Sequence, residues 1–129
     1  MEEMTYNSIL IVDDEPIVRE SLRDWLQHAG YKVETAQNGE EALTFVKNND
    51  YSIIILDIRL PGKTGIAVLQ EIKAIKPQIK SIFISAYPTV EFSNEAKRLG
   101  ALDFLIKPIV PDDLEKLIKE TLEKNIGQL

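Results

Sequence analysis

The sequence contains no cysteine and only one histidine, His28. The missing thiols exclude disulfides, thiolate metal sites and cysteine nucleophiles, and they fit a reducing compartment. A single imidazole also excludes a multi-histidine metal site. No apolar run approaches the roughly 20 residues of a membrane-spanning helix, and the acidic N-terminal stretch MEEMTYN does not resemble a signal peptide. We therefore expect a cytoplasmic protein.

Positive charge is also scarce, because 15 lysines and arginines are set against 21 aspartates and glutamates. The formal net charge of −6 disfavours nucleic acid and membranes as partners of this domain alone, since both favour a basic surface. The length of 129 residues, with 44% hydrophobic and 28% charged residues, indicates one globular domain.

Five short segments have the composition of β-strands. Three of them are apolar on both faces, as is typical of strands that are covered on both sides of a sheet. These three are SILIV (8–12), SIIIL (52–56) and SIFIS (81–85), and the other two are YKVETA (31–36) and LDFLI (102–106).

A helical pattern follows each of these strands. The first helix is expected to begin at Pro16 and to end at Gly30. Its apolar face would carry Val18, Leu22, Trp25, Leu26 and Ala29, with Trp25 in the core. Asn38 and Glu41 have the spacing of a capping box that opens the second helix. A third helix is expected to end near Pro77, a fourth to run from about Thr89 to Gly100, and a fifth to run from Pro111 to Asn125.

Strict alternation of strand and helix predicts an α/β fold with a mostly parallel sheet. Right-handed crossovers then favour a flavodoxin-like, doubly wound five-stranded sheet of order 2-1-3-4-5 with five helices. We expect residues 1–7 to be an N-terminal extension, 8–125 the domain, and 126–129 a tail or the start of a linker.

Chemically reactive residues follow four of the five strands. Asp13 and Asp14 follow the first strand, Asp57 the third, Ser85 ends the fourth and Lys107 follows the fifth. Each residue alone is better explained as a helix cap, a turn residue or a surface lysine. Together they fall at the carboxyl ends of the strands, where open α/β sheets bind ligands. The sequence therefore predicts a functional site there.

The charges of this group indicate a divalent cation. Two carboxylates about 5 Å apart repel by roughly 3 kcal/mol at an effective dielectric constant of about 20. Lys107 supplies one positive charge, and oxygen ligands favour Mg²⁺, or Ca²⁺ or Mn²⁺, for the rest. An aspartate beside such an ion can attack phosphorus and form an acyl phosphate. Asp57 suits the nucleophile, and the adjacent Asp13 and Asp14 suit the metal.

The segments IVDDEP, LDIRLPGKTG, ISAY and LIKP, in this order and spacing, resemble the receiver domain of two-component response regulators. The similarity runs from about Ser8 to Asn125. It implies that Asp57 accepts a phosphoryl group from the phosphohistidine of a histidine kinase. It also implies that Asp14, Asp57 and the backbone carbonyl of Arg59 bind Mg²⁺, while Asp13 acts largely through water.

The resemblance implies roles at the other strand ends as well. Ser85 and Lys107 would hold the phosphoryl oxygens, and the peptide before Pro108 would be cis. Phe104 would be a switch aromatic that turns inward when Ser85 moves toward the phosphate, although its pattern fits core packing equally well. The face formed by the fourth helix, fifth strand and fifth helix would report phosphorylation to a partner or an output domain.

Two positions are expected to tune the acyl phosphate. Arg59 and Tyr87 occupy sites that set the hydrolysis rate in the family, and their bulk is expected to hinder attacking water. Pro88 departs from the small residues common in the family at this loop, and it restricts its own backbone and that of Tyr87.

Other functions are compatible with part of this pattern. A Mg²⁺-dependent aspartyl phosphatase would want an Asp-x-Asp pair and a cap, whereas the chain has adjacent Asp13 and Asp14 and no segment long enough for a cap. A flavin or dinucleotide site would need a glycine-rich loop after the first strand, which is acidic here. A stand-alone signalling adaptor remains an alternative to a receiver fused to an output domain.

The expected activity is thus self-catalysed phosphorylation and slow dephosphorylation rather than turnover of a substrate. The phrase DIRLPGKTG and the first helix resemble receivers fused to transcription activators, which favours a transcriptional output. A phosphorylation-dependent homodimer is a further option.

Overall fold

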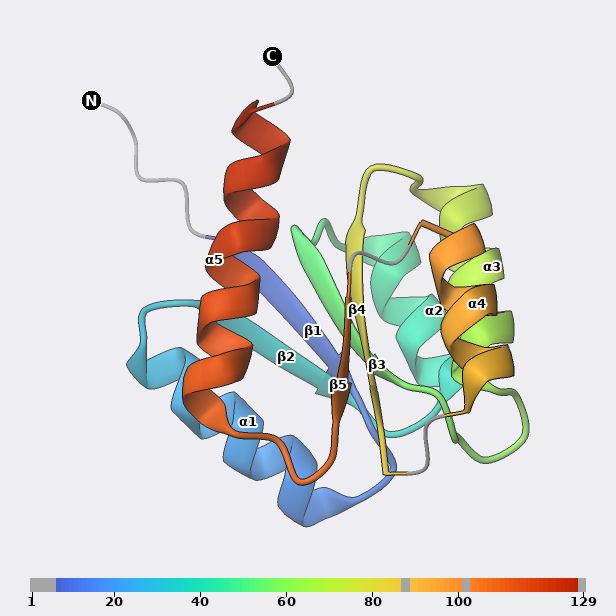
Figure 1. Ribbon diagram of the computed structural model, residues 1–129, viewed down its shortest axis with the longest axis horizontal. Helices are drawn as coiled ribbons and strands as arrows, with labels where there is room; N and C mark the ends of the chain where they lie inside the picture. Colours follow the sequence, from blue (N-terminus) through green and yellow to red (C-terminus); the bar gives the residue numbers. More distant parts are fainter. Residues whose placement is uncertain (1–6, 87–88, 101–102, 128–129) are drawn as a thin grey trace.

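The computed structural model describes residues 7–86, 89–100 and 103–127 (Figure 1). These residues form five strands and five helices that alternate along the chain. The elements are β1 (Ser8–Val12), α1 (Pro16–His28), β2 (Lys32–Ala36), α2 (Gly39–Asn48), β3 (Ile53–Asp57), α3 (Gly65–Ile75), β4 (Lys80–Ser85), α4 (Val90–Arg98), β5 (Asp103–Ile106) and α5 (Pro111–Gly127).

The predicted fold class and strand order are confirmed. The strands form one parallel sheet of order β2-β1-β3-β4-β5. The chain reverses its winding between β1 and β3, which are neighbours in the sheet although β2 separates them in sequence. The carboxyl ends of these two strands therefore border the switch point of the fold.

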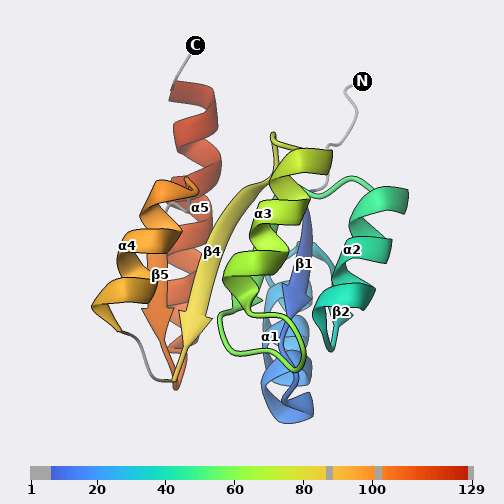
Figure 2. The same ribbon diagram turned by 90° about the vertical axis from the view of Figure 1, so that its right-hand side faces the viewer.

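Helices cover both faces of the sheet (Figures 1 and 2). Two hydrophobic clusters, one on each face, hold the helices against it. Alternate residues of β1 point to opposite faces, so Ile9 and Ile11 join one cluster, and Leu10 and Val12 join the other. The first cluster packs under α1 and α5, and the second under α2, α3 and α4. Because both faces are covered, β3 is buried throughout, and β1 and β4 are buried after their first residue, as their composition predicts.

The ends of the first two helices follow the expected local rules. Gly30 has a φ of 105° and its N–H donates to Gln27 O at 3.0 Å, which closes α1. Asn38 Oδ1 accepts the N–H of Glu41 at 2.9 Å and caps α2. The Glu41 carboxylate accepts the N–H of Gln37 rather than that of Asn38, so the reciprocal half of the capping box is shifted by one residue.

The core assignment of Trp25 was wrong, because its side chain is 39% exposed. The buried stripe of α1 is centred on Leu22 and Leu26, which lie one turn apart. Trp25 precedes Leu26 by one residue, which turns it by about 100° around the helix axis and places it at the stripe's edge. Ala29, also expected on this face, is exposed because it is the C-cap residue that follows the last helical residue, His28.

Candidate functional site

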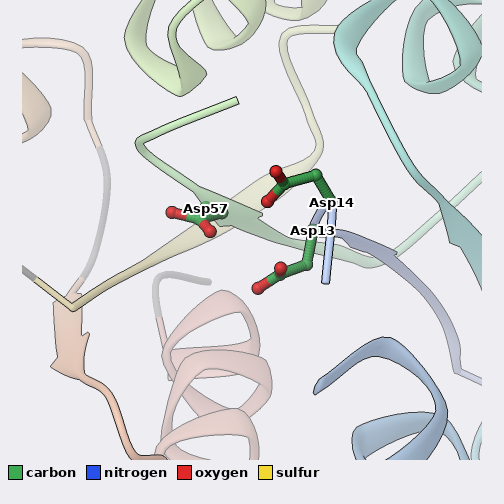
Figure 3. A group of neighbouring side chains, drawn as sticks. All are labelled: Asp13, Asp14 and Asp57. Atoms are coloured by element: carbon green, nitrogen blue, oxygen red, sulfur yellow. The ribbon is translucent and has the colours of Figure 1, made fainter. Parts of the chain in front are cut away.

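Three aspartates meet where β1 and β3 end. Asp57 is the last residue of β3, and Asp13 and Asp14 follow β1. Each offers a carboxylate oxygen, and the three oxygens lie within 4.8 Å of one another (Figure 3). Asp13 and Asp57 are buried, whereas Asp14 is exposed, so the cluster opens to solvent on the side of Asp14.

Backbone groups orient the two buried carboxylates. Asp13 Oδ1 accepts the N–H of Glu15 at 2.9 Å, and Asp57 Oδ1 accepts the N–H of Arg59 at 2.9 Å. The carbonyl of Asp13 in turn accepts a hydrogen bond from Arg19 Nη1 at 2.8 Å. In each aspartate one oxygen is held by the loop that follows its strand, and the other turns toward Lys107.

Lys107 brings its ammonium into the middle of the acids. Its Nζ lies 2.8 Å from Asp13 Oδ2, 2.8 Å from Asp57 Oδ2 and 2.7 Å from Glu15 Oε1. Burial by itself would lower the pKa of Lys107, but these three carboxylates outweigh it and raise the pKa above its ordinary value of 10.5. The side chain therefore stays positively charged at physiological pH.

One ammonium does not satisfy this cluster. Burial raises the pKa of Asp13, and the negative charge of Asp57 adds to that rise, against the opposing contacts with Lys107 and the Glu15 N–H. Asp13 Oδ2 is buried, and within the described part of the chain it receives no well-directed hydrogen bond despite its ion pair with Lys107. Hard oxygen ligands, excess negative charge and one solvent-exposed member fit a bound Mg²⁺.

The remaining predicted residues come from β4, β5 and the segments that follow these strands. Ser85 ends β4, is fully buried, and its carbonyl accepts the N–H of Lys107 at 2.9 Å. The Lys107–Pro108 peptide is cis, as predicted. Phe104 lies in β5, is partly buried and packs against the cluster under α2, α3 and α4. Tyr87 and Pro88 lie outside the described residues.

Two residues that contact the site were not predicted from the sequence. Glu15 binds Lys107, and Arg19, one turn into α1, binds the carbonyl of Asp13. The signal for Glu15 was visible, since it continues the acidic run at the end of β1. Arg19 carries no signal beyond its position on the first turn of the helix that follows.

This fold and site define a doubly wound α/β domain with a cluster of three aspartates at its switch point. The family model of the response regulator receiver domain matches residues 9–119, and the chain belongs to that family. Receiver domains bind Mg²⁺ at an acidic pocket of this kind and partner with histidine kinases. No helix among the described residues combines the length and the apolar character needed to cross a bilayer.

The chain is similar to the transcriptional regulatory protein ZraR of Escherichia coli (strain K12), with 38% identity over 125 residues. That match covers 92% of this chain but 27% of ZraR, so the chain spans about a quarter of that relative's length. Sporulation initiation phosphotransferase F of Bacillus subtilis (strain 168) is 34% identical over 119 residues, which cover 92% of this chain and 96% of that protein.

A solved structure gives the same comparison in three dimensions. The response regulator protein TrrA from Thermotoga maritima, in complex with Mg²⁺-BeF, superposes with a TM-score of 0.80 at 37% sequence identity. The match covers 89% of this chain and 98% of that one.

Proposed function

We propose that this chain is a phosphoacceptor switch and that Asp57 receives the phosphoryl group of a histidine kinase's phosphohistidine. One observation carries the proposal: the Asp57 carboxylate lies within 4.8 Å of two further aspartates and 2.8 Å from the Lys107 ammonium. A nucleophile, a cation site and a fixed positive charge are the parts that phosphoryl transfer needs.

The proposed transfer requires little covalent chemistry from the protein. An Asp57 carboxylate oxygen forms a bond to phosphorus as the phosphorus–nitrogen bond of the donor breaks. The imidazole leaves with the electron pair and takes up a proton. Lys107 and the hydroxyl of Ser85 hold the phosphoryl oxygens, and a bound Mg²⁺ would supply neutralisation of their charge.

The proposed Mg²⁺ ligands are Asp14, Asp57 and the backbone carbonyl of Arg59. Asp13 would act largely through water. The burial of Asp13 and the exposure of Asp14 support this division, because the ion would approach from the solvent side. The side chain of Arg59 is expected to slow hydrolysis by hindering water, together with Tyr87.

Phosphorylation would shift the protein between two arrangements. A phosphoryl group adds nearly two negative charges and three acceptor oxygens, which would draw Ser85 toward it. Phe104 is expected to move inward as Ser85 leaves. The face of α4, β5 and α5 would carry the change outward, and Ile106, which is 59% exposed on the edge strand β5, gives that face an apolar contact point.

Apolar surface near the site supports a protein partner there. Ile17, in the first turn of α1, is 80% exposed. It borders a cavity of about 410 Å³ whose lining also includes Glu15, Lys107, Pro108 and Ile109. A kinase presenting its phosphohistidine to Asp57 would cover this surface.

We further propose that residues 8–125 form the receiver and that residues 126–129, of which the first two complete α5, lead into a linker or form a tail. Similarity to ZraR supports a transcriptional output, and similarity to sporulation initiation phosphotransferase F supports a receiver without one. We also propose that the protein acts in the cytoplasm and, on phosphorylation, can form a homodimer.

Mass spectrometry after incubation with acetyl phosphate and Mg²⁺ tests the central proposal. One base-labile phosphoryl adduct should form, and it should be lost with EDTA or in Asp57→Asn. Asp24→Asn, which removes an exposed carboxylate of α1, is the matched control and should form the adduct normally. An adduct that persists in Asp57→Asn would contradict the assignment.

A further inference from the structure

The contacts of Lys107 raise a question about how the site admits a phosphoryl group. An ammonium has three N–H donors. Nζ donates hydrogen bonds to Glu15 Oε1 at 2.7 Å and to Asp57 Oδ2 at 2.8 Å, and it forms an ion pair with Asp13 Oδ2 at 2.8 Å. A phosphoryl oxygen that binds Lys107 must therefore compete with these carboxylates for the ammonium.

The three carboxylates differ in how easily they can leave. The side chains of Asp13 and Asp57 are 0% and 5% exposed, and backbone N–H groups hold their other oxygens. The Glu15 side chain is 58% exposed and reaches Lys107 from the solvent side. Because the Glu15 carboxylate is solvated while the Lys107 side chain is only 11% exposed, Glu15 is the member of the cluster that can be released into water at the lowest cost.

The backbone of Glu15 allows this movement. Glu15 is the N-cap of α1, but within the described chain its side chain makes no capping hydrogen bond. Its N–H is held by Asp13 Oδ1, which fixes the main chain independently of the carboxylate. The side chain can therefore swing away from Lys107 while α1 keeps its start.

We propose that Glu15 competes with the incoming phosphoryl group for Lys107 and so restrains anion binding and phosphorylation of Asp57. This inference rests on the proposed function of the same site. Glu15 is a positioning residue, because it acts through Lys107. It masks the ammonium in the unphosphorylated protein and must be displaced when the dianionic group arrives. Its own negative charge adds a repulsion that the phosphoryl group must overcome.

Glu15→Gln tests the inference because it removes the charge and keeps the size of the side chain. At saturating Mg²⁺, we expect the variant to bind beryllium fluoride, an anionic phosphoryl mimic, about fivefold more tightly, the factor for one charge pair near 4 Å in a water-like dielectric. Fluorine NMR measures this affinity without any phosphorylation. The second-order rate of phosphorylation by acetyl phosphate should rise by a similar factor.

Glu20→Gln is the matched control, because it changes the net charge equally at another exposed position of α1. Its affinity for beryllium fluoride and its rate of phosphorylation should stay within about twofold of those of the unsubstituted protein. High salt should reduce the gain in affinity of Glu15→Gln, because it screens the charge of Glu15. Thermal unfolding of each variant verifies that it is folded.

The outcomes separate the inference from the proposed function. Equal affinity and rate in Glu15→Gln and the unsubstituted protein would overturn the inference alone. Weaker binding in Glu15→Gln would also overturn it, because Glu15 would then orient Lys107 rather than compete for it. If the unsubstituted protein formed neither the fluoride complex nor the adduct, the proposed function would fall, and the inference with it.

Discussion

The repulsion among the three aspartates makes a prediction about stability that does not depend on phosphorylation. We expect Asp14→Asn to stabilise the metal-free protein. Asp14 is exposed, and the oxygens of Asp13 and Asp57 lie within 4.8 Å of its own. Removing Asp14's charge relieves both repulsions and leaves intact the contacts of Lys107 with Asp13, Asp57 and Glu15.

The size of the effect follows from Coulomb's law. At 4.8 Å, two unit charges interact by roughly 1 kcal/mol in a water-like dielectric and by roughly 3 kcal/mol at an effective constant of about 20. Because Asp14 is exposed, we take the lower value for each of its two neighbours. Attraction to Lys107 offsets part of this, which leaves a net gain of about 1 to 2 kcal/mol in the free energy of unfolding.

Added Mg²⁺ should remove or reverse the difference in the free energy of unfolding between Asp14→Asn and the unsubstituted protein. A ligand at ten times its dissociation constant stabilises the native state by about 1.4 kcal/mol. The unsubstituted protein should gain this amount, whereas Asp14→Asn, which lacks a proposed ligand, should gain much less. The two curves of stability against Mg²⁺ concentration should therefore converge or cross.

Urea denaturation followed by circular dichroism, in EDTA and across a Mg²⁺ titration, measures both effects. Thermal melting should show the same order, with a shift of roughly 3 to 8 °C in EDTA. Glu20→Gln is the control for net charge. It should change neither the stability in EDTA nor the stabilisation by Mg²⁺ appreciably. Lower stability of Asp14→Asn in EDTA, or an undiminished Mg²⁺ response, would show that the acids do not share one cation site.

Three further predictions concern the surrounding fold. Gly65→Ala should lower stability and slow phosphorylation together, because its Cβ would lie 2.2 Å from the backbone oxygen of Asp57; denaturation and adduct formation measure the two effects. Asn38→Ala removes the cap of α2 and should lower the free energy of unfolding by about 1 kcal/mol in urea titrations. Burial and the hydrogen bond to Glu34 raise the pKa of Tyr51 above 10.0. The unfolded state then loses its proton first, so stability should fall as the pH rises above 10, with a shallower slope in Tyr51→Phe.

The fold was predictable because each strand and helix carries its own signal. SILIV and SIIIL are apolar on both faces, which requires a sheet covered on both sides, and Gly30 and Asn38 mark helix ends by backbone chemistry. The strand boundaries shifted by a residue or so, as with β3, which includes Asp57 itself. Such shifts leave the carboxyl ends of the strands, and therefore the candidate site, in the same place.

The contacts that sequence reasoning missed depend on side-chain reach across the fold. Glu15 and Lys107 are separated by 92 positions, and only the parallel arrangement of β1 and β5 in one sheet brings their tips to 2.7 Å. Trp25 was misplaced for a related reason. Helical spacing predicts which side of α1 faces the core. The width of the buried stripe depends on the elements that pack against α1, which only the assembled fold shows.

Charge balance links the stability prediction to the inference about Glu15. The carboxylates of Asp13, Glu15 and Asp57 contact the ammonium of Lys107, and Asp14 lies beside Asp13 and Asp57. These four carboxylates and the ammonium together carry a formal charge of −3. Such a site favours a cation and opposes an anion, yet phosphorylation of Asp57 must bring an anion in. Neutralising Asp14 should therefore weaken cation binding, whereas neutralising Glu15, which masks the ammonium, should strengthen anion binding. If Asp14→Asn and Glu15→Gln changed the affinities for Mg²⁺ and for beryllium fluoride by the same amounts, only the total charge of the site would matter. If Asp14→Asn mainly weakened Mg²⁺ binding and Glu15→Gln mainly strengthened beryllium fluoride binding, the position of each charge within the cluster would matter.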